Sequence, residues 1–172
     1  MDLSNLTDSE IRDLVIAKKV GIADFIDSGI CPTCFNRRNN EILYGDNSDK
    51  IIYEDELFEC FLVGNPRAIG HTAISTKVHY KDMSEVDSET NMKIMDLARR
   101  LMIVLKNVYG PESVYLCTMC DGPMNHFHVQ LIPRYSYEKR GSRNFVKPRK
   151  EYVHDEKKVK SLRKFIVEEV GK

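Results

Sequence analysis

The sequence lacks the features that mark a membrane-spanning or secreted chain. No apolar run approaches the about 20 residues that a transmembrane helix needs. The opening segment, residues 1–13, has neither the basic region nor the apolar core of a secretory signal. We therefore expect a cytoplasmic protein with no membrane partner.

A net charge is also lacking, because 26 Lys and Arg residues balance 26 Asp and Glu residues among the 172 of the chain. A neutral chain has no overall electrostatic attraction to nucleic acid, so we expect no nucleic-acid partner. A small anionic substrate in a local pocket remains compatible with this balance. The sequence shows no internal repeat, and its length suits one domain with short extensions.

The five cysteines are an odd number, and four of them form two C-x-x-C pairs, Cys31/Cys34 and Cys117/Cys120. Without a secretory signal, this pattern favours reduced thiols used for metal or redox chemistry over disulfide bonds. Cys31 and Cys34 have the ligand spacing of a thiolate pair on zinc. The redox interpretation would need a β-α-β setting, which this region lacks.

Hydrophobic periodicity and turn residues predict helices and strands in an irregular alternation. A capping box at Thr7 and Glu10 begins the first helix, and a second helix covers 22–28. The segment 31–34 is expected to be a knuckle, too short and too constrained by proline for a regular element. Strands are predicted at 57–63, 69–77, 113–118 and 127–133, with helices at 87–109 and 155–170 and a basic loop at 139–150. Strands without a β-α-β rhythm favour an α+β fold with an antiparallel sheet.

The stretch from Asn125 to Arg134 carries the most chemical information. Side chains alternate between the two faces of a strand, so His126, His128 and Gln130 share one face. The intervening Phe127, Val129 and Leu131 then point into the core. Two imidazoles and an amide on one face indicate a functional site; the competing interpretation is the solvent-facing side of an edge strand.

The motif His-x-His-x-Gln followed by Leu-Ile-Pro-Arg resembles the signature of the histidine-triad (HIT) superfamily. The upstream segments 53–63 and 70–79, with Gly-His-Thr before a strand and a histidine after it, resemble the same family. The resemblance covers about residues 31–134. It implies a five-stranded antiparallel sheet with a long helix. We expect an N-terminal helical extension at 1–29, a HIT-like catalytic domain at 30–135, and a basic loop with a C-terminal helix at 136–172.

Gln130 departs from the third histidine that most small members of the family have. This variant is similar to the transferase and phosphorylase branches, such as galactose-1-phosphate uridylyltransferase and diadenosine tetraphosphate phosphorylase. The resemblance makes His128 the nucleophile toward a nucleotide's α-phosphorus, with its other ring nitrogen donating to a backbone carbonyl. The Gln130 amide can bind a phosphoryl oxygen but cannot protonate a leaving group, so anhydrides should be better substrates than phosphoramidates.

These features predict a nucleotide phosphoanhydride hydrolase or nucleotidyltransferase acting through a nucleotidyl-His128 intermediate. Dinucleoside polyphosphates and nucleoside diphosphate derivatives are the expected substrates, and water, phosphate or a sugar phosphate is the acceptor. One alternative is a nucleotide-binding or sensing module with little turnover. Another is a zinc-stabilised interaction or nucleic-acid module, which the neutral charge and the lack of an aromatic–basic surface pattern disfavour.

Three further residues are candidate nucleotide contacts. Gly122 and Asn125 precede the triad, where the family places a phosphate-contacting loop, although Asn125 suits an ordinary turn equally well. Asn65 follows the first long strand and is a candidate for the ribose. Arg134 and the basic 139–150 segment either steer polyphosphate or are solvated.

The resemblance also completes the zinc site. Several members of the family add the histidine after the Gly-His-Thr strand and the first triad histidine, which here are His79 and His126. With Cys31 and Cys34 these give a closed, structural Zn²⁺ site. A four-cysteine site with Cys117 and Cys120, or no metal, remains an alternative. We expect Cys60 in the hydrophobic core, His71 as a buried, hydrogen-bonded structural histidine, and His154 at the surface. Because many members of the family pair as dimers, a homodimer is possible here.

Overall fold

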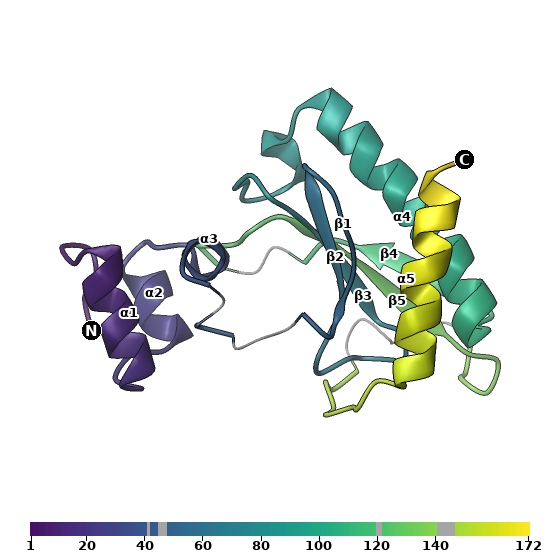
Figure 1. Ribbon diagram of the computed structural model, residues 1–172, viewed down its shortest axis with the longest axis horizontal. Helices are drawn as coiled ribbons and strands as arrows, with labels where there is room; N and C mark the ends of the chain where they lie inside the picture. Colours follow the sequence, from purple (N-terminus) through teal and green to yellow (C-terminus); the bar gives the residue numbers. More distant parts are fainter. Residues whose placement is uncertain (41, 45–47, 120–121, 141–146) are drawn as a thin grey trace.

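The computed structural model describes residues 1–40, 42–44, 48–119, 122–140 and 147–172. Within these ranges the chain forms six helices and five strands (Figure 1). The helices are α1 (Asp8–Ile16), α2 (Ile22–Asp27), α3 (Pro32–Arg38), the 3-10 helix η1 (Met83–Glu85), α4 (Ser88–Tyr109) and α5 (Glu156–Val170). The strands are β1 (Ile51–Glu54), β2 (Phe58–Leu62), β3 (Thr72–Thr76), β4 (Ser113–Cys117) and β5 (His128–Arg134).

The strands form one antiparallel sheet in the order β1-β2-β3-β5-β4. The expected α+β class and five-stranded antiparallel sheet are therefore confirmed. The strand that carries His128 and Gln130 lies between β3 and β4, so it is not an edge strand and the solvent-facing interpretation was wrong. β1 was not recognised in the sequence, because a short strand leaves too few residues to show an alternating pattern.

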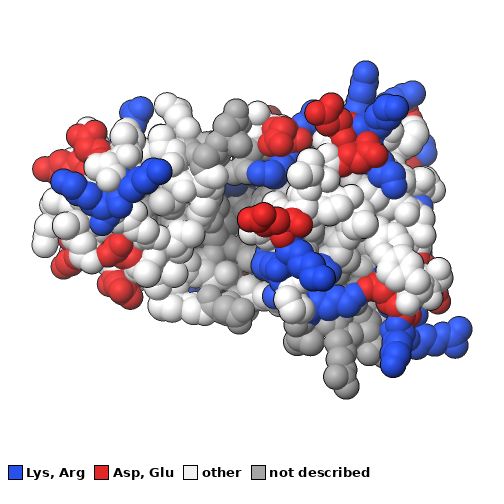
Figure 2. Space-filling view, turned by 90° about the horizontal axis from the view of Figure 1, so that it is seen from below, with Lys and Arg blue, Asp and Glu red and all other residues white. Residues whose placement is uncertain are grey.

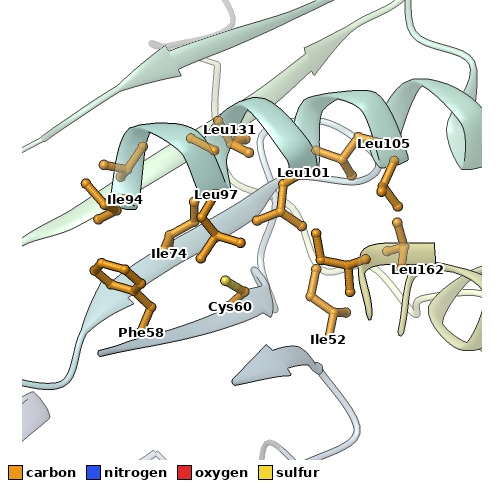
Figure 3. Packing of buried hydrophobic residues seen from close by; sticks show 14 of the residues in the cluster. Ile52, Phe58, Cys60, Ile74, Ile94, Leu97, Leu101, Leu105, Leu131 and Leu162 are labelled. Atoms are coloured by element: carbon orange, nitrogen blue, oxygen red, sulfur yellow. The ribbon is translucent and has the colours of Figure 1, made fainter. Parts of the chain in front are cut away.

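One face of the sheet is covered by α4 and α5, which enclose the main hydrophobic core. Leu97, Leu101 and Leu105 of α4 lie above strand residues such as Phe58 and Ile74 (Figure 3). Val129 and Leu131 of β5 are fully buried in this core. Because side chains alternate along a strand, His128 and Gln130 point to the opposite face, which α4 and α5 leave uncovered. Cys60 lies in the same core, as expected.

A second, smaller core holds α1, α2 and α3 together beside the sheet (Figure 1). Its buried side chains are Leu3, Ile11, Phe25 and Phe35. The predicted capping box is present, since the Thr7 hydroxyl accepts from the Glu10 amide and the Glu10 carboxylate accepts from the Thr7 amide.

The prediction of an irregular knuckle at 31–34 was wrong, because Pro32 begins helix α3 there. Cys31 is the N-cap, and its sulfur accepts from the Cys34 amide at 3.5 Å. Proline is favoured at the first helical position, where its missing N–H costs no hydrogen bond and its φ is already helical. The proline that was taken as an obstacle to regular structure therefore starts the helix.

The strand predicted at 69–77 begins only at Thr72, because the preceding turn has a special conformation. Gly70 has φ +80°, and a Cβ at this position would lie 2.9 Å from a ring carbon of Tyr109. Only glycine meets both conditions without strain. The turn places His71 at the start of β3.

Acidic and basic side chains are interspersed over the face of the molecule seen in Figure 2, as the balanced composition leads one to expect. Among the residues that the structure describes, no helix is both long and apolar enough to cross a membrane.

Candidate functional site

The face of the sheet opposite the helices gathers polar side chains from three neighbouring strands. In the strand register, Gln130 lies opposite Ala73 of β3 and Cys117 of β4, and His128 lies opposite Ser75. Directly opposed residues in antiparallel strands point to the same face. His128 is half-buried, whereas Gln130 is 3% exposed. A buried amide beside a reachable imidazole is therefore the centre of this face.

A continuous chain of hydrogen bonds runs through these side chains. The Arg67 backbone amide bonds His71 Nδ1 at 3.1 Å, and His71 Nε2 lies 3.0 Å from Gln130 Oε1. Gln130 Nε2 lies 3.1 Å from His128 Nε2, and His128 Nδ1 lies 2.8 Å from the His126 carbonyl oxygen.

The direction of the chain follows from the groups at its ends. A backbone amide can only donate and a carbonyl can only accept. His71 Nδ1 therefore accepts, and its Nε2–H donates to Gln130 Oε1. The Gln130 amide then donates to His128 Nε2, while His128 Nδ1–H donates to the carbonyl of His126. This order leaves His128 Nε2 unprotonated, with its lone pair accepting from the Gln130 amide.

The chain requires a neutral His71, because a protonated ring could not accept from Arg67. Burial, together with the positive charges of Arg149 and Arg67, lowers the pKa of His71 to about 4. His71 is fully buried. The expectation that His71 is a buried, hydrogen-bonded histidine is borne out, and its position links it to Gln130.

A second cluster lies at the beginning of β5. Cys31, Cys34, His79 and His126 bring their ligand atoms within 4.8 Å of one another, a possible metal site. His126 Nδ1 lies 3.5 Å from Cys31 Sγ, 3.4 Å from Cys34 Sγ and 3.3 Å from His79 Nδ1. His79 Nδ1 lies 3.5 Å from Cys34 Sγ.

These four separations are close to the edges of a ligand tetrahedron around zinc. Zn–S bonds of about 2.3 Å and Zn–N bonds of about 2.0–2.1 Å at tetrahedral angles place neighbouring ligand atoms about 3.3–3.8 Å apart. The His126 ring is also prepared for coordination, since its Nε2–H donates to the Thr76 carbonyl at 2.7 Å and leaves Nδ1 unprotonated. Burial lowers the pKa of His126 to about 4, which keeps the ring neutral.

The thiols of this cluster need a cation to ionise. Burial, together with the neighbouring Cys31, raises the pKa of the Cys34 thiol to about 11. A bound metal reverses this preference, because a coordinated thiol loses its proton. Cys117 is not a member of the cluster among the described residues, and Cys120 lies outside them.

Helix α3 is attached to the sheet independently of the cluster. Arg37 Nη1 donates to the carbonyls of Thr76 and Lys77 at 3.1 Å each, where β3 ends. Its guanidinium also lies 3.7 Å from the Glu59 carboxylate on β2. The two cysteines are thus held against the strand end that carries the His79 loop.

The family model of the HIT domain matches residues 45–137, which is more than half of the chain. The chain belongs to the HIT family. An uncharacterized HIT-like protein of Methanocaldococcus jannaschii is 30% identical over 99 residues, which are 55% of this chain and 76% of that protein.

Solved structures of HIT proteins share the fold. A hypothetical histidine triad nucleotide-binding protein from Sulfolobus tokodaii superposes with a TM-score of 0.59 at 25% identity, covering 82% of this chain and 92% of that one. A zinc-bound histidine triad family protein from Mycobacterium smegmatis superposes with a TM-score of 0.57 at 20% identity, covering 70% of this chain and 86% of that one. A diadenosine triphosphate hydrolase from Plasmodium falciparum superposes with a TM-score of 0.56 at 16% identity, covering 73% of this chain and 82% of that one.

The three residues predicted to contact nucleotide all lie in segments without regular secondary structure. Asn65 is exposed, and its carbonyl accepts from Arg149 at 3.5 Å. The Asn125 side chain donates to the Lys81 carbonyl, which joins the loops before η1 and β5. Gly122 has φ +90°, and a Cβ at this position would meet no atom within 4 Å among the described residues. Their contacts with nucleotide stay predictions.

Two basic or titratable residues differ from expectation. Arg134 is 5% exposed and pairs with Glu112 at 2.6 Å, so it holds β5 to the start of β4 and is not free to steer phosphate. His154, expected at the surface, is half-buried and lies 3.1 Å from the Val63 carbonyl. Both partners are distant in sequence, and local patterns could not reveal them.

A cavity of about 400 Å³ lies on the helix side of the molecule, away from His128. Its walls come from β1, the turn before β2, and the first half of α4, including Tyr53, Asp55, Met92 and Arg100. None of the residues in the hydrogen-bond chain or in the Cys/His cluster lines it. The polar face of the sheet therefore remains the candidate site.

Proposed function

We propose that this protein is a nucleotide phosphoanhydride hydrolase or nucleotidyltransferase that acts through a nucleotidyl-His128 intermediate. The observation that carries the proposal is the directed hydrogen-bond chain, which leaves an unprotonated Nε2 on His128 at the open face. A neutral imidazole with a defined lone pair is a suitable nucleophile near pH 7. Membership in the HIT family supports nucleotides as ligands.

In the first step, His128 Nε2 forms a bond to the α-phosphorus, and the bond from that phosphorus to the leaving phosphate oxygen breaks. The electron pair of that bond leaves with the phosphate. The ring becomes a positively charged nucleotidyl-imidazolium, and its Nδ1–H still donates to the His126 carbonyl. That contact stabilises the cation, because the carbonyl dipole points its negative end at the proton.

In the second step, an acceptor oxygen from water, phosphate or a sugar phosphate attacks the same phosphorus. The P–N bond breaks, its electron pair returns to His128 Nε2, and the acceptor loses its proton to solvent when it carries one. Gln130 acts in both steps by turning its N–H from His128 Nε2 to a non-bridging phosphoryl oxygen. His71 holds the other end of the amide, which keeps the N–H directed at the phosphoryl group.

The same amide limits the substrates. Gln130 has no proton to give a leaving group, so the leaving group must depart as a stable anion. Phosphates of anhydrides meet this requirement, whereas amines of phosphoramidates do not. Dinucleoside polyphosphates and nucleoside diphosphate derivatives are the substrates that we propose on this ground. The diadenosine triphosphate hydrolase of the same fold is consistent with such substrates.

We further propose that Cys31, Cys34, His79 and His126 hold a structural zinc ion. Four protein ligands would close the tetrahedron and leave no position for a reactive water. When bound, the metal would supply a crosslink between α3 and the loops that precede α4 and β5. His126 belongs to both sites, because its ring faces the cluster while its carbonyl accepts from His128.

A covalent adduct should appear on the wild-type protein after brief incubation with a dinucleoside polyphosphate. Intact-protein mass spectrometry is expected to show a gain of one nucleotide, absent in His128→Ala, whose kcat should fall by on the order of 10³-fold or more. AMP, which has no leaving phosphate, serves as the control and should give no adduct. Equal turnover by His128→Ala would contradict the proposal, and no turnover by either protein across a nucleotide panel would favour a binding or sensing module.

Substitution at Gln130 should change both rate and leaving-group preference. Gln130→Ala is expected to lower kcat/KM on a dinucleoside polyphosphate by on the order of 10²-fold, as for the loss of one oxyanion donor. Gln130→His restores an acid and should raise the rate on a nucleoside phosphoramidate relative to the anhydride by at least about tenfold. A wild-type protein that cleaves the phosphoramidate faster than the anhydride would overturn the leaving-group argument.

Metal analysis should find one zinc ion per wild-type chain. Cys34→Ser and His79→Ala are expected to lose the zinc ion. Both variants should unfold at a lower temperature, because without the metal no crosslink joins α3 to the sheet. Cys117→Ser is the matched control and should retain zinc. Loss of zinc from Cys117→Ser would favour the four-cysteine site. If the wild-type protein purified from zinc-supplemented cells contains no metal, both the Cys/His site and the four-cysteine site are excluded.

A further inference from the structure

A basic segment just before α5 lies against the loop that leads into the candidate site. Residues 147–154 run along residues 63–67, the stretch that follows β2. Arg67 Nη1 donates to the Lys147 carbonyl at 2.5 Å, and Arg149 Nη1 donates to the Asn65 carbonyl at 3.5 Å. The Lys150 amide donates to the Pro66 carbonyl at 3.3 Å. These contacts bring two arginines from distant parts of the chain onto the same pair of neighbouring segments.

Each guanidinium group contacts the backbone of the segment that carries the other arginine. Arg149 is exposed, and partial desolvation together with the charge of Arg67 lowers its pKa. Neither arginine forms an ion pair with any residue that the structure describes. Arg67 Nε is buried and has no hydrogen-bond partner among those residues. Two adjacent cations with an unused buried donor are the arrangement that an anion with several oxygens would satisfy.

The pair lies next to the proposed nucleophile. The backbone of Arg67 begins the hydrogen-bond chain that ends at His128. The positive charges of both arginines act on His71. Arg67 also acts on Cys117, which lies opposite Gln130 on the same face of the sheet. Arg67 is therefore held, through its backbone, next to the residues that orient His128.

We propose that Arg67 and Arg149 bind the phosphates of a polyphosphate chain beyond the one attacked by His128. The inference rests on the proposed function and narrows its substrate class to nucleotides with an extended polyphosphate, such as dinucleoside polyphosphates. Two planar guanidinium groups can each bind phosphate oxygens in pairs, which lysine cannot. They also offset negative charge that builds up on the departing phosphate.

Binding of inorganic tripolyphosphate, measured by calorimetry, tests the pair without any nucleotide chemistry. Arg149→Gln and Arg67→Gln are each expected to weaken the affinity at least about tenfold, as for one charge-assisted contact. Arg12→Gln, an exposed arginine on α1, is the matched control and should bind as the wild type does. Arg149→Lys keeps the charge but loses the planar fork, and should fall between wild type and Arg149→Gln.

The double substitution of Arg67 and Arg149 adds a second criterion. If both arginines bind the same anion, the double substitution should lower the binding free energy by less than the sum of the two single substitutions. Thermal unfolding of each variant separates a docking role from a binding role, because a purely docking arginine changes the unfolding temperature and leaves the affinity unchanged. Unchanged affinity in a folded Arg149→Gln, or no binding of tripolyphosphate by the wild type, would overturn the inference.

Adduct formation and tripolyphosphate binding, measured separately, distinguish this inference from the proposed function. If the wild type forms no nucleotidyl adduct and turns over no nucleotide, but loses tripolyphosphate affinity on substitution of Arg149, the arginine pair stands and the proposed catalysis falls. If nucleotidyl adducts form but substitution of neither arginine changes the affinity for tripolyphosphate, the proposed catalysis stands and the arginine pair falls.

Discussion

The hydrogen bonds from the Arg67 amide through His71 and Gln130 to His128 all run in one direction, and the candidate site depends on that direction. Each ring in the chain can carry its proton on only one nitrogen, because the backbone groups at the two ends cannot exchange roles. His128 Nε2 is consequently unprotonated, and its lone pair accepts from the Gln130 amide until that N–H turns to a phosphoryl oxygen. A reversed tautomer would place a proton where the proposed mechanism needs a nucleophile.

The rest of the fold holds the two ends of this chain in place. Gly70 allows the tight turn before His71, and the central position of β5 keeps Gln130 between two neighbouring strands. At the other end, the His126 carbonyl that accepts from His128 belongs to a residue whose ring lies in the Cys/His cluster. The cluster and the candidate active site are therefore coupled through one residue.

Local patterns in the sequence predicted the parts that depend on neighbouring residues. The alternation around β5 separated Phe127, Val129 and Leu131 from the polar face, and the spacing of Cys31 and Cys34 pointed to a ligand pair. Helix α3 was missed because the proline was taken as a breaker and not as a first helical residue. The contacts of Arg67 with Lys147 and of Arg149 with Asn65 join segments about 80 residues apart, which no local pattern can reveal.

The most direct test of the account is the protonation state of the His128 ring, measured by long-range ¹H–¹⁵N correlation in the ligand-free protein near pH 7. The account predicts a proton on Nδ1 and none on Nε2, with the opposite arrangement on His71. Assignment by His128→Ala and His71→Asn would identify the signals. A proton on Nε2 of His128 would contradict the directed chain and, with it, the proposed nucleophile.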